Sequence, residues 1–211
     1  MSDFELILAS SSPRRAKLLQ NLGLSFRIVK PGKVSEVLEG PAEEVVKRNA
    51  LTKLRAVLKE VMASGVSDAV VVAADTVVLA PGGKVLGKPS STGEAREMLN
   101  ALRCGWHSVL TGVAVGVVKG AEQVAEEVFT DETRVRMRCF SDEELEAYLR
   151  SGEPLGKAGA YALQGLGALL VDRVEGDPYN VVGLPLARLH EALMRVAKVN
   201  LLELVPRPRP G

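Results

Sequence analysis

The chain has 211 residues, of which 46% are hydrophobic, 25% charged and 4% aromatic. Its formal net charge of +1 argues against nucleic-acid or membrane binding driven by bulk electrostatics. No apolar run approaches the ~18 to 20 residues needed to cross a bilayer, and the start of the chain is too acidic for a signal peptide. We therefore expect a soluble cytoplasmic protein with one domain over residues 1–205, followed by a flexible Pro/Arg tail over 206–211.

Apolar periodicity predicts strands that alternate with helices, and at least two strand pairs that form hairpins. In chain order we predict a strand at 4–9, a helix at 13–22, a strand at 25–30, a loop at 31–41, a helix at 42–62, strands at 69–80 and 85–89, a helix at 92–103, strands at 109–118 and 124–140, a helix at 141–152, a Gly-rich strand and turn at 159–176, and a helix at 186–198. This order predicts an α/β fold with a mixed twisted sheet and flanking helices.

The junction "ASSSPRR" after the first predicted strand supports two interpretations. Ser12 is a good N-cap and Pro13 suits the first helical position, so the serines can simply begin a helix. A helix N-terminus also attracts phosphate, to which Ser10 would add a donor and an arginine a matching fork. Arg14 and Arg15 oppose the helix dipole by about 0.3 to 1 kcal/mol each, which favours an anion-binding role. The residues alone leave both interpretations open.

Asp75 interrupts the apolar segment "VVVAADTVVLA". A carboxylate is costly to bury without partners, so we expect it at the exposed end of this strand, lining a cleft. The alternative is an Asp that caps a turn. The apolar flanks favour the functional interpretation.

Several isolated polar residues could form a binding site only if the fold brings them together. Glu39, Lys53 and Lys88 are each most simply solvated surface charges, but together they would suit a polyphosphate with a divalent metal such as Mg²⁺. Gln164 lies between an apolar run and a glycine, where its amide can read a base edge or satisfy backbone groups. His107 and His190 are isolated, which argues against a histidine metal site.

Cys104 and Cys139 form neither a CxxC motif nor a Cys/His cluster. We interpret them as small buried residues, with a disulfide as the alternative. The glycines do not form GxxxxGK[ST], so the sequence does not support a P-loop.

Eight stretches in this order resemble the Maf family of nucleoside triphosphate pyrophosphatases. They are "LILASSSPRRAKLL", "AADTVV", "LGKP", "ML", "HSVLTGV", "FSDEELEAYL", "KAGAYALQG" and "GDPYNVVGLPL". The resemblance implies two lobes around a deep cleft, like that of the inosine triphosphate pyrophosphatases. It implies hydrolysis of a nucleoside triphosphate to the monophosphate and pyrophosphate with Mg²⁺ or Mn²⁺, and it suggests a homodimer.

The resemblance also assigns roles to residues. It implies that Asp75 is the catalytic proton acceptor and that Glu39 helps it to hold the metal. By the same resemblance, Arg15, Lys53 and Lys88 hold the triphosphate and offset the charge that develops on it, and Ser10 is a further substrate-binding position. This chain departs from the family at Leu38, which stands where the family often has an acid, so Glu36 and Glu39 are competing candidates for the metal.

Three further positions bear on the substrate. Arg14, Thr76 and Gln164 look like the family branch that acts on dTTP and UTP. The alternatives are a pyrophosphatase for 7-methyl-GTP or modified purine triphosphates, and a non-catalytic regulator of septum formation and cell division.

Overall fold

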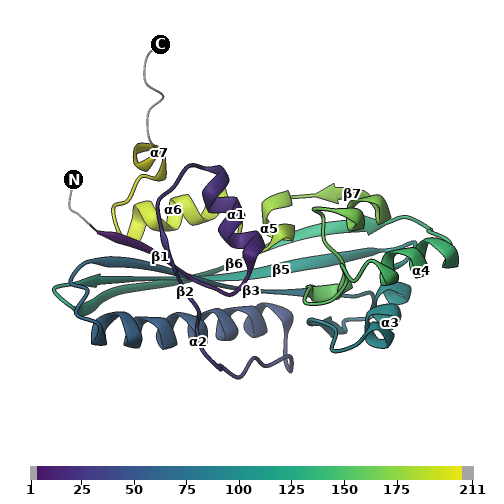
Figure 1. Ribbon diagram of the computed structural model, residues 1–211, viewed down its shortest axis with the longest axis horizontal. Helices are drawn as coiled ribbons and strands as arrows, with labels where there is room; N and C mark the ends of the chain where they lie inside the picture. The colour runs from purple at the N-terminus through teal and green to yellow at the C-terminus, as the bar shows by residue number, and fades with distance from the viewer. Residues whose placement is uncertain (1–3, 206–211) are drawn as a thin grey trace, which may run out of the picture.

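One mixed seven-stranded sheet runs the length of the molecule, in the computed structural model that describes residues 4–205 (Figure 1). The strand order is β2-β1-β3-β5-β6-β7, and the short strand β4 pairs with β3. Strand β1 is parallel to both of its neighbours, and the other pairs are antiparallel. The strands are β1 (Glu5–Ala9), β2 (Arg27–Val29), β3 (Ala69–Leu79), β4 (Val85–Leu86), β5 (Trp106–Lys119), β6 (Glu122–Met137) and β7 (Val171–Glu175). The expected α/β class with a mixed sheet is confirmed.

The helices begin largely where the capping residues predict. Helix α4 has a complete capping box, in which Ser141 accepts from the Glu144 N–H and the Glu144 side chain accepts from the Ser141 N–H. The α-helices are α1 (Pro13–Asn21), α2 (Ala42–Ala63), α3 (Thr92–Leu102), α4 (Asp142–Arg150), α5 (Pro178–Val182), α6 (Leu186–Val196) and α7 (Leu201–Leu204). Two 3₁₀ turns, η1 (Ala158–Ala160) and η2 (Leu166–Leu170), precede β7. We did not predict the short helices α5 and α7.

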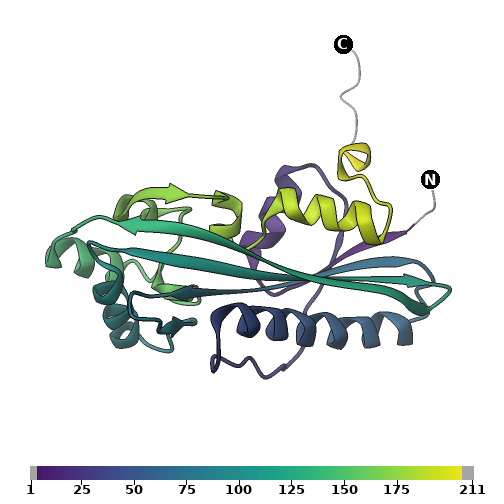
Figure 2. The same cartoon turned by 180° about the vertical axis from the view of Figure 1, so that it is seen from behind.

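The helices cover both faces of the sheet. Helix α2 lies along one face, and α1 and α6 lie on the opposite face (Figures 1 and 2). Leu54 and Leu58 of α2 pack with Val71 of β3, whereas Leu19 of α1 packs with Val72 on the other face. Successive side chains of a strand point to opposite faces, so β3 contributes to both layers. Helices α3 and α4 pack in a separate core at the far end of the sheet.

Strand β3 has a gap in its pairing on one side. Strand β1 pairs with it only as far as Ala73, and β4 begins to pair at Val78. Within residues 4–205, no strand pairs with residues 74–77 on that side. The gap separates two lobes, one built around α1, α2 and α6 and the other around α3 and α4, as the family resemblance implies.

Two expectations need correction. Asp75 lies in the interior of β3 rather than at its end, because Lys53 and Asn49 of α2 supply the partners that a buried carboxylate needs. Cys104 and Cys139 form a disulfide rather than two free thiols. The Cys104 N–H donates to the Arg138 carbonyl at 3.1 Å, which places the two cysteine Cα atoms 4.3 Å apart.

The tail expected over residues 206–211 lies outside the described residues. Among residues 4–205, no helix combines the length and the apolar character that a bilayer span requires.

Candidate active site

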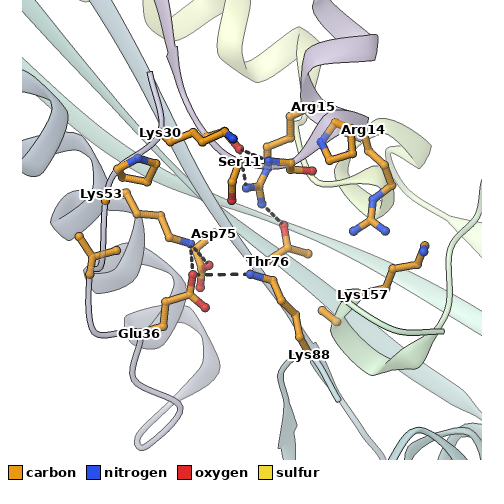
Figure 3. Close-up of a pocket in the computed structure, with 18 of the residues that line it drawn as sticks. Ser11, Arg14, Arg15, Lys30, Glu36, Lys53, Asp75, Thr76, Lys88 and Lys157 are labelled. Carbon is orange, nitrogen blue, oxygen red and sulfur yellow. Dashed lines mark hydrogen bonds and ion pairs between the residues drawn. The ribbon is translucent and has the colours of Figure 1, made fainter. Parts of the chain in front are cut away.

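A cleft of about 740 Å³ opens beside the unpaired part of β3. Figure 3 shows that polar side chains from both lobes surround Asp75 and Thr76, with Lys53 and Glu36 on one side and Lys88 on the other. The lining residues are 10–15, 30–34, Glu36, Lys53, Asp75, Thr76, Lys88 and 155–158. Nine of these are Lys, Arg, Asp or Glu side chains, and most of them are cationic: Arg14, Arg15, Lys30, Lys33, Lys53, Lys88, Lys157, Asp75 and Glu36. This composition suits a polyanionic ligand.

Asp75 forms the floor of the cleft and is only 4% exposed. The Lys53 Nζ lies 2.5 Å from its Oδ1, and the Asn49 Nδ2 donates to its Oδ2 at 2.8 Å. Both partners lie on the inner face of α2, one turn apart. Each carboxylate oxygen is therefore held by a separate donor.

Glu36 approaches the same ammonium from the loop between β2 and α2. Its Oε1 lies 2.7 Å from the Lys53 Nζ and 3.6 Å from the Lys88 Nζ (Figure 3). Partial burial by itself raises the pKa of Glu36, but the Lys53 hydrogen bond and the charges of Lys53, Lys88 and Arg15 bring the net pKa below its ordinary value. Glu36 is consequently a carboxylate at neutral pH.

Arg15 is buried at the N-terminus of α1 on the opposite face of β3 from Lys53. Its Nε donates to the Gly183 carbonyl at 2.7 Å, and its Nη2 donates to the Thr76 Oγ1 at 2.9 Å. The Thr76 hydroxyl also contacts the Thr111 hydroxyl at 2.9 Å. Burial lowers the pKa of Arg15 to about 10, so the guanidinium stays charged at neutral pH. Thr76 thus acts by orienting Arg15.

A second cationic group lies on the far side of the cleft. Arg14 of α1 and Lys157 of the loop after α4 have their charged ends next to each other (Figure 3). Burial is the main cause that lowers the pKa of each, and for Lys157 the charge of Arg14 lowers it further. Two like charges held close together favour an anion between or beside them.

The structure brings most of the predicted site residues together. Those that line the cleft are Ser10, Arg14, Arg15, Lys53, Asp75, Thr76 and Lys88. Glu39 and Gln164 are exposed and are not among the lining residues. The Glu39 backbone carbonyl accepts from Arg48, and the position expected for its carboxylate is taken by Glu36.

Sequence reasoning missed four charged or amide side chains of this site. Lys30, Lys33 and Lys157 line the cleft, and Asn49 of α2 donates a hydrogen bond to Asp75. Lys157 begins the "KAGAYALQG" stretch, so the sequence indicated this motif but not that Lys157 enters the cleft. Asn49 precedes Lys53 by four residues, which puts both side chains on one helix face. That spacing was the available signal.

The carboxylates of Asp75 and Glu36 fit a divalent cation. Both contact one ammonium, that of Lys53, so they lie close together on two separate elements. Mg²⁺ is commonly bound by one or two carboxylates and completes its shell with water and substrate phosphate. Residues 4–205 contain no group of three or more His, Cys, Asp or Glu side chains placed to hold a metal without such help.

Comparison with known proteins places the chain in a family. A HAM1 protein of known structure from Coxiella burnetii is similar over 65% of this chain and 75% of its own, with 16% identity and a TM-score of 0.41. A Dictyoglomus thermophilum protein named dTTP/UTP pyrophosphatase is 45% identical over 91% of this chain and 96% of its own. One of the same name from Moorella thermoacetica is 47% identical over 90% and 93%. The family model described as Maf-like protein matches residues 5–196, and the chain therefore belongs to the Maf-like protein family.

Proposed function

We propose that the protein hydrolyses dTTP and UTP to the nucleoside monophosphate and pyrophosphate, with the help of a divalent cation. The observation that carries the proposal is Asp75, a buried carboxylate with both oxygens held, at the floor of a cleft lined by lysines and arginines. In this reaction a water oxygen bonds to the α-phosphorus, and the bond from that phosphorus to the oxygen bridging to the β-phosphate breaks.

Asp75 is the proton acceptor for the attacking water. A carboxylate fixed in one orientation can take a proton as the oxygen–phosphorus bond forms. Lys53 and Asn49 hold this carboxylate from α2, so it does not have to be ordered during the reaction. The leaving pyrophosphate carries away the negative charge of the broken bond.

The cations of the cleft hold the triphosphate and offset the charge that develops on it. Arg15 and Lys88 reach the cleft from opposite lobes, so a chain of phosphates can bridge them. The Ser10 Oγ accepts from the Ser12 N–H at 3.1 Å, which orients its hydroxyl beside the N-terminus of α1. A fixed array of such donors stabilises a charged transition state more than mobile water does, because the donors need not reorient during the reaction.

Glu36 and Asp75 are the residues that would hold Mg²⁺ or Mn²⁺. When bound, the cation neutralises charge on the phosphate oxygens and polarises the α-phosphate. Glu36 takes the role that the sequence assigned to Glu39, because only Glu36 contacts Lys53 and Lys88.

Two observations support the preference for dTTP and UTP over other nucleotides: the names of the relatives and the position of Arg14. Four relatives that are 42–47% identical to this chain carry the name dTTP/UTP pyrophosphatase. Arg14 lies at the cleft rim, where its side chain can contact the nucleoside, whereas Gln164 lies on the exposed loop before η2. A homodimer and a cytoplasmic location stay predictions.

The test is pyrophosphate release from a panel of nucleotides, in the presence of Mg²⁺ or Mn²⁺ and after chelation. We expect dTTP and UTP to be turned over fastest, and the Asp75→Asn variant to lose about 10² to 10⁴-fold in kcat. Asp68→Asn is the matched control, because Asp68 lies before the same strand and outside the cleft. Faster turnover of 7-methyl-GTP than of dTTP and UTP would contradict the proposed substrates.

A further inference from the structure

The Asn49 side chain connects the floor of the cleft to the loop that carries Glu36. Asn49 lies on α2, is 2% exposed, and precedes Lys53 by one helical turn. Its Nδ2 donates to the Asp75 Oδ2 at 2.8 Å and to the Val37 carbonyl at 2.9 Å. Its Oδ1 accepts from the Val37 N–H at 3.0 Å. One buried amide thus binds both the carboxylate and the backbone next to Glu36.

The loop over residues 30–41 depends on such side-chain contacts for its position. It contains no helix or strand, so no regular backbone pairing fixes it. Its other described anchors include the ion pairs of Glu36 and the hydrogen bond from Arg48 to the Glu39 carbonyl. Leu38 also packs here, and its side chain occupies the space where a Cβ on Gly87 would lie. The Asn49 amide uses both hydrogens and its oxygen here, which places Val37 relative to α2.

A purely structural role would satisfy the Val37 backbone and nothing more. Asn49 instead aims one of its two N–H bonds at Asp75, whose other oxygen is held by Lys53. The two donors hold the carboxylate at both oxygens and prevent rotation about its Cβ–Cγ bond. The same two residues also hold the loop, since Lys53 pairs with Glu36 and Asn49 binds Val37.

We propose that Asn49 is a positioning residue that sets the Glu36 carboxylate at a fixed separation from Asp75. The inference rests on the proposed function, because that separation matters only if the two carboxylates act on one substrate or cation. Asn49 itself touches neither the substrate nor the cation. It acts through Glu36 and Asp75, so its loss should lower kcat more than it changes KM.

The experiment compares Asn49→Leu, which keeps the side-chain volume but removes all three hydrogen bonds, with the wild-type protein. We expect kcat for dTTP to fall about tenfold to hundredfold, as for loss of a hydrogen bond to a charged group, with a smaller change in KM. Val57→Ala is the matched control, because Val57 is buried on the same helix and lies outside the cleft. Its kcat should stay at the wild-type level even if its melting temperature falls. If Asn49→Leu does not fold, Asn49→Ala takes its place.

A double-mutant cycle with Glu36→Gln separates positioning from general damage. If Asn49 acts through Glu36, Asn49→Leu should cost at least threefold less in kcat when Glu36 is already absent. If the kcat loss of the double variant equals the product of the losses of the two single variants, the proposal is wrong. So would an equal loss of kcat in Val57→Ala and Asn49→Leu.

Hydrogen exchange of the Val37 amide gives a readout that does not need turnover. The Val37 N–H is bound to Asn49, so its exchange should accelerate in Asn49→Leu and stay slow in Val57→Ala. Unchanged exchange at Val37 would overturn the inference. If the wild-type protein releases no pyrophosphate from any nucleotide, the proposed function fails, and exchange at Val37 still decides whether Asn49 holds the loop.

Discussion

Gly112 of β5 lies directly opposite Asp75 of β3, and the absence of a side chain there lets α2 come close to that carboxylate. A Cβ on Gly112 would overlap the Val46 carbonyl in the first half of α2. Asn49 and Lys53 follow Val46 by one and two turns on the same helix. The contacts between α2 and Asp75 therefore depend on a glycine that touches neither donor.

Replacing this glycine should damage the site from a distance. In Gly112→Ala the new methyl group pushes α2 away from the sheet, which lengthens the bonds from Lys53 and Asn49 to Asp75. We expect kcat for dTTP to fall at least tenfold and the free energy of unfolding to fall by about 1 to 3 kcal/mol. Steady-state kinetics and denaturant unfolding measure the two effects. Gly93→Ala is the control: its Cβ would meet only Ser91 at 3.7 Å, so both quantities should hardly change.

The two neighbouring arginines should respond differently to substitution. Arg15 lines the cleft as a largely buried charge held in place by its bonds to Gly183 and Thr76, so Arg15→Ala should lower kcat/KM by about 10² or more for every nucleotide. Arg14 lies at the rim, so Arg14→Trp should change the ratio of kcat/KM between dTTP and a purine triphosphate instead. The same nucleotide panel measures both. A uniform loss in Arg14→Trp, with unchanged preference, would contradict the division.

Reduction of the disulfide should destabilise the protein without abolishing activity. Cys104 and Cys139 close a loop with a sequence separation of 35, for which chain-entropy arguments give roughly 4 kcal/mol. Neither cysteine lines the cleft. We expect a reductant to lower the melting temperature while kcat at 25 °C is retained. A Cys104→Ser/Cys139→Ser variant should melt at the lower temperature with or without reductant, and equal melting of the oxidised and reduced wild type would disprove the stabilisation.

His107 should make the fold sensitive to mild acid. Burial lowers its pKa from 6.5 to about 4, and its Nε2 lies 2.8 Å from the Tyr161 hydroxyl. Between these two pH values the unfolded chain binds a proton that the folded protein does not, so stability falls as the pH falls from 6.5 towards 4, by at most about 3 kcal/mol. Denaturant unfolding at several pH values measures this slope. His107→Gln should flatten it over that window, and an unchanged slope would rule out His107 as the cause.

The sequence predicted the strands and long helices well because their apolar patterns are local. The segment 69–80 is apolar except for Asp75 and Thr76, and β3 is indeed buried on both faces. The position of Asp75 within it was not predictable in the same way. Its burial depends on Lys53 and Asn49, whose approach is set by packing at Gly112 rather than by any residue near Asp75.

The site residues on loops were the hardest to assign. Glu36 and Glu39 are three residues apart in a segment without regular structure, and contacts from α2 place Glu36 rather than Glu39 next to Lys53. Asn49 binds the Val37 backbone, and Arg48 binds the Glu39 carbonyl. The disulfide was missed because Cys104 and Cys139, 35 residues apart, meet only through the pairing of β5 with β6, in which Trp106 lies opposite Arg136. Motif strings located the cleft, while long-range contacts decided which side chains enter it.

Strands β5 and β6 have 14 and 16 residues and continue without a break through both lobes. The lobes are therefore two ends of one twisted ribbon rather than two bodies joined by a flexible linker. Any widening of the cleft must bend this ribbon and strain the hydrogen bonds between β5 and β6 along the way, so we expect small-amplitude breathing to admit the nucleotide. The register of these strands is irregular only at Val117/Val118 and, between β6 and β7, at Arg136/Met137. The part of the β5–β6 ribbon next to Asp75 is therefore regularly paired and stiff.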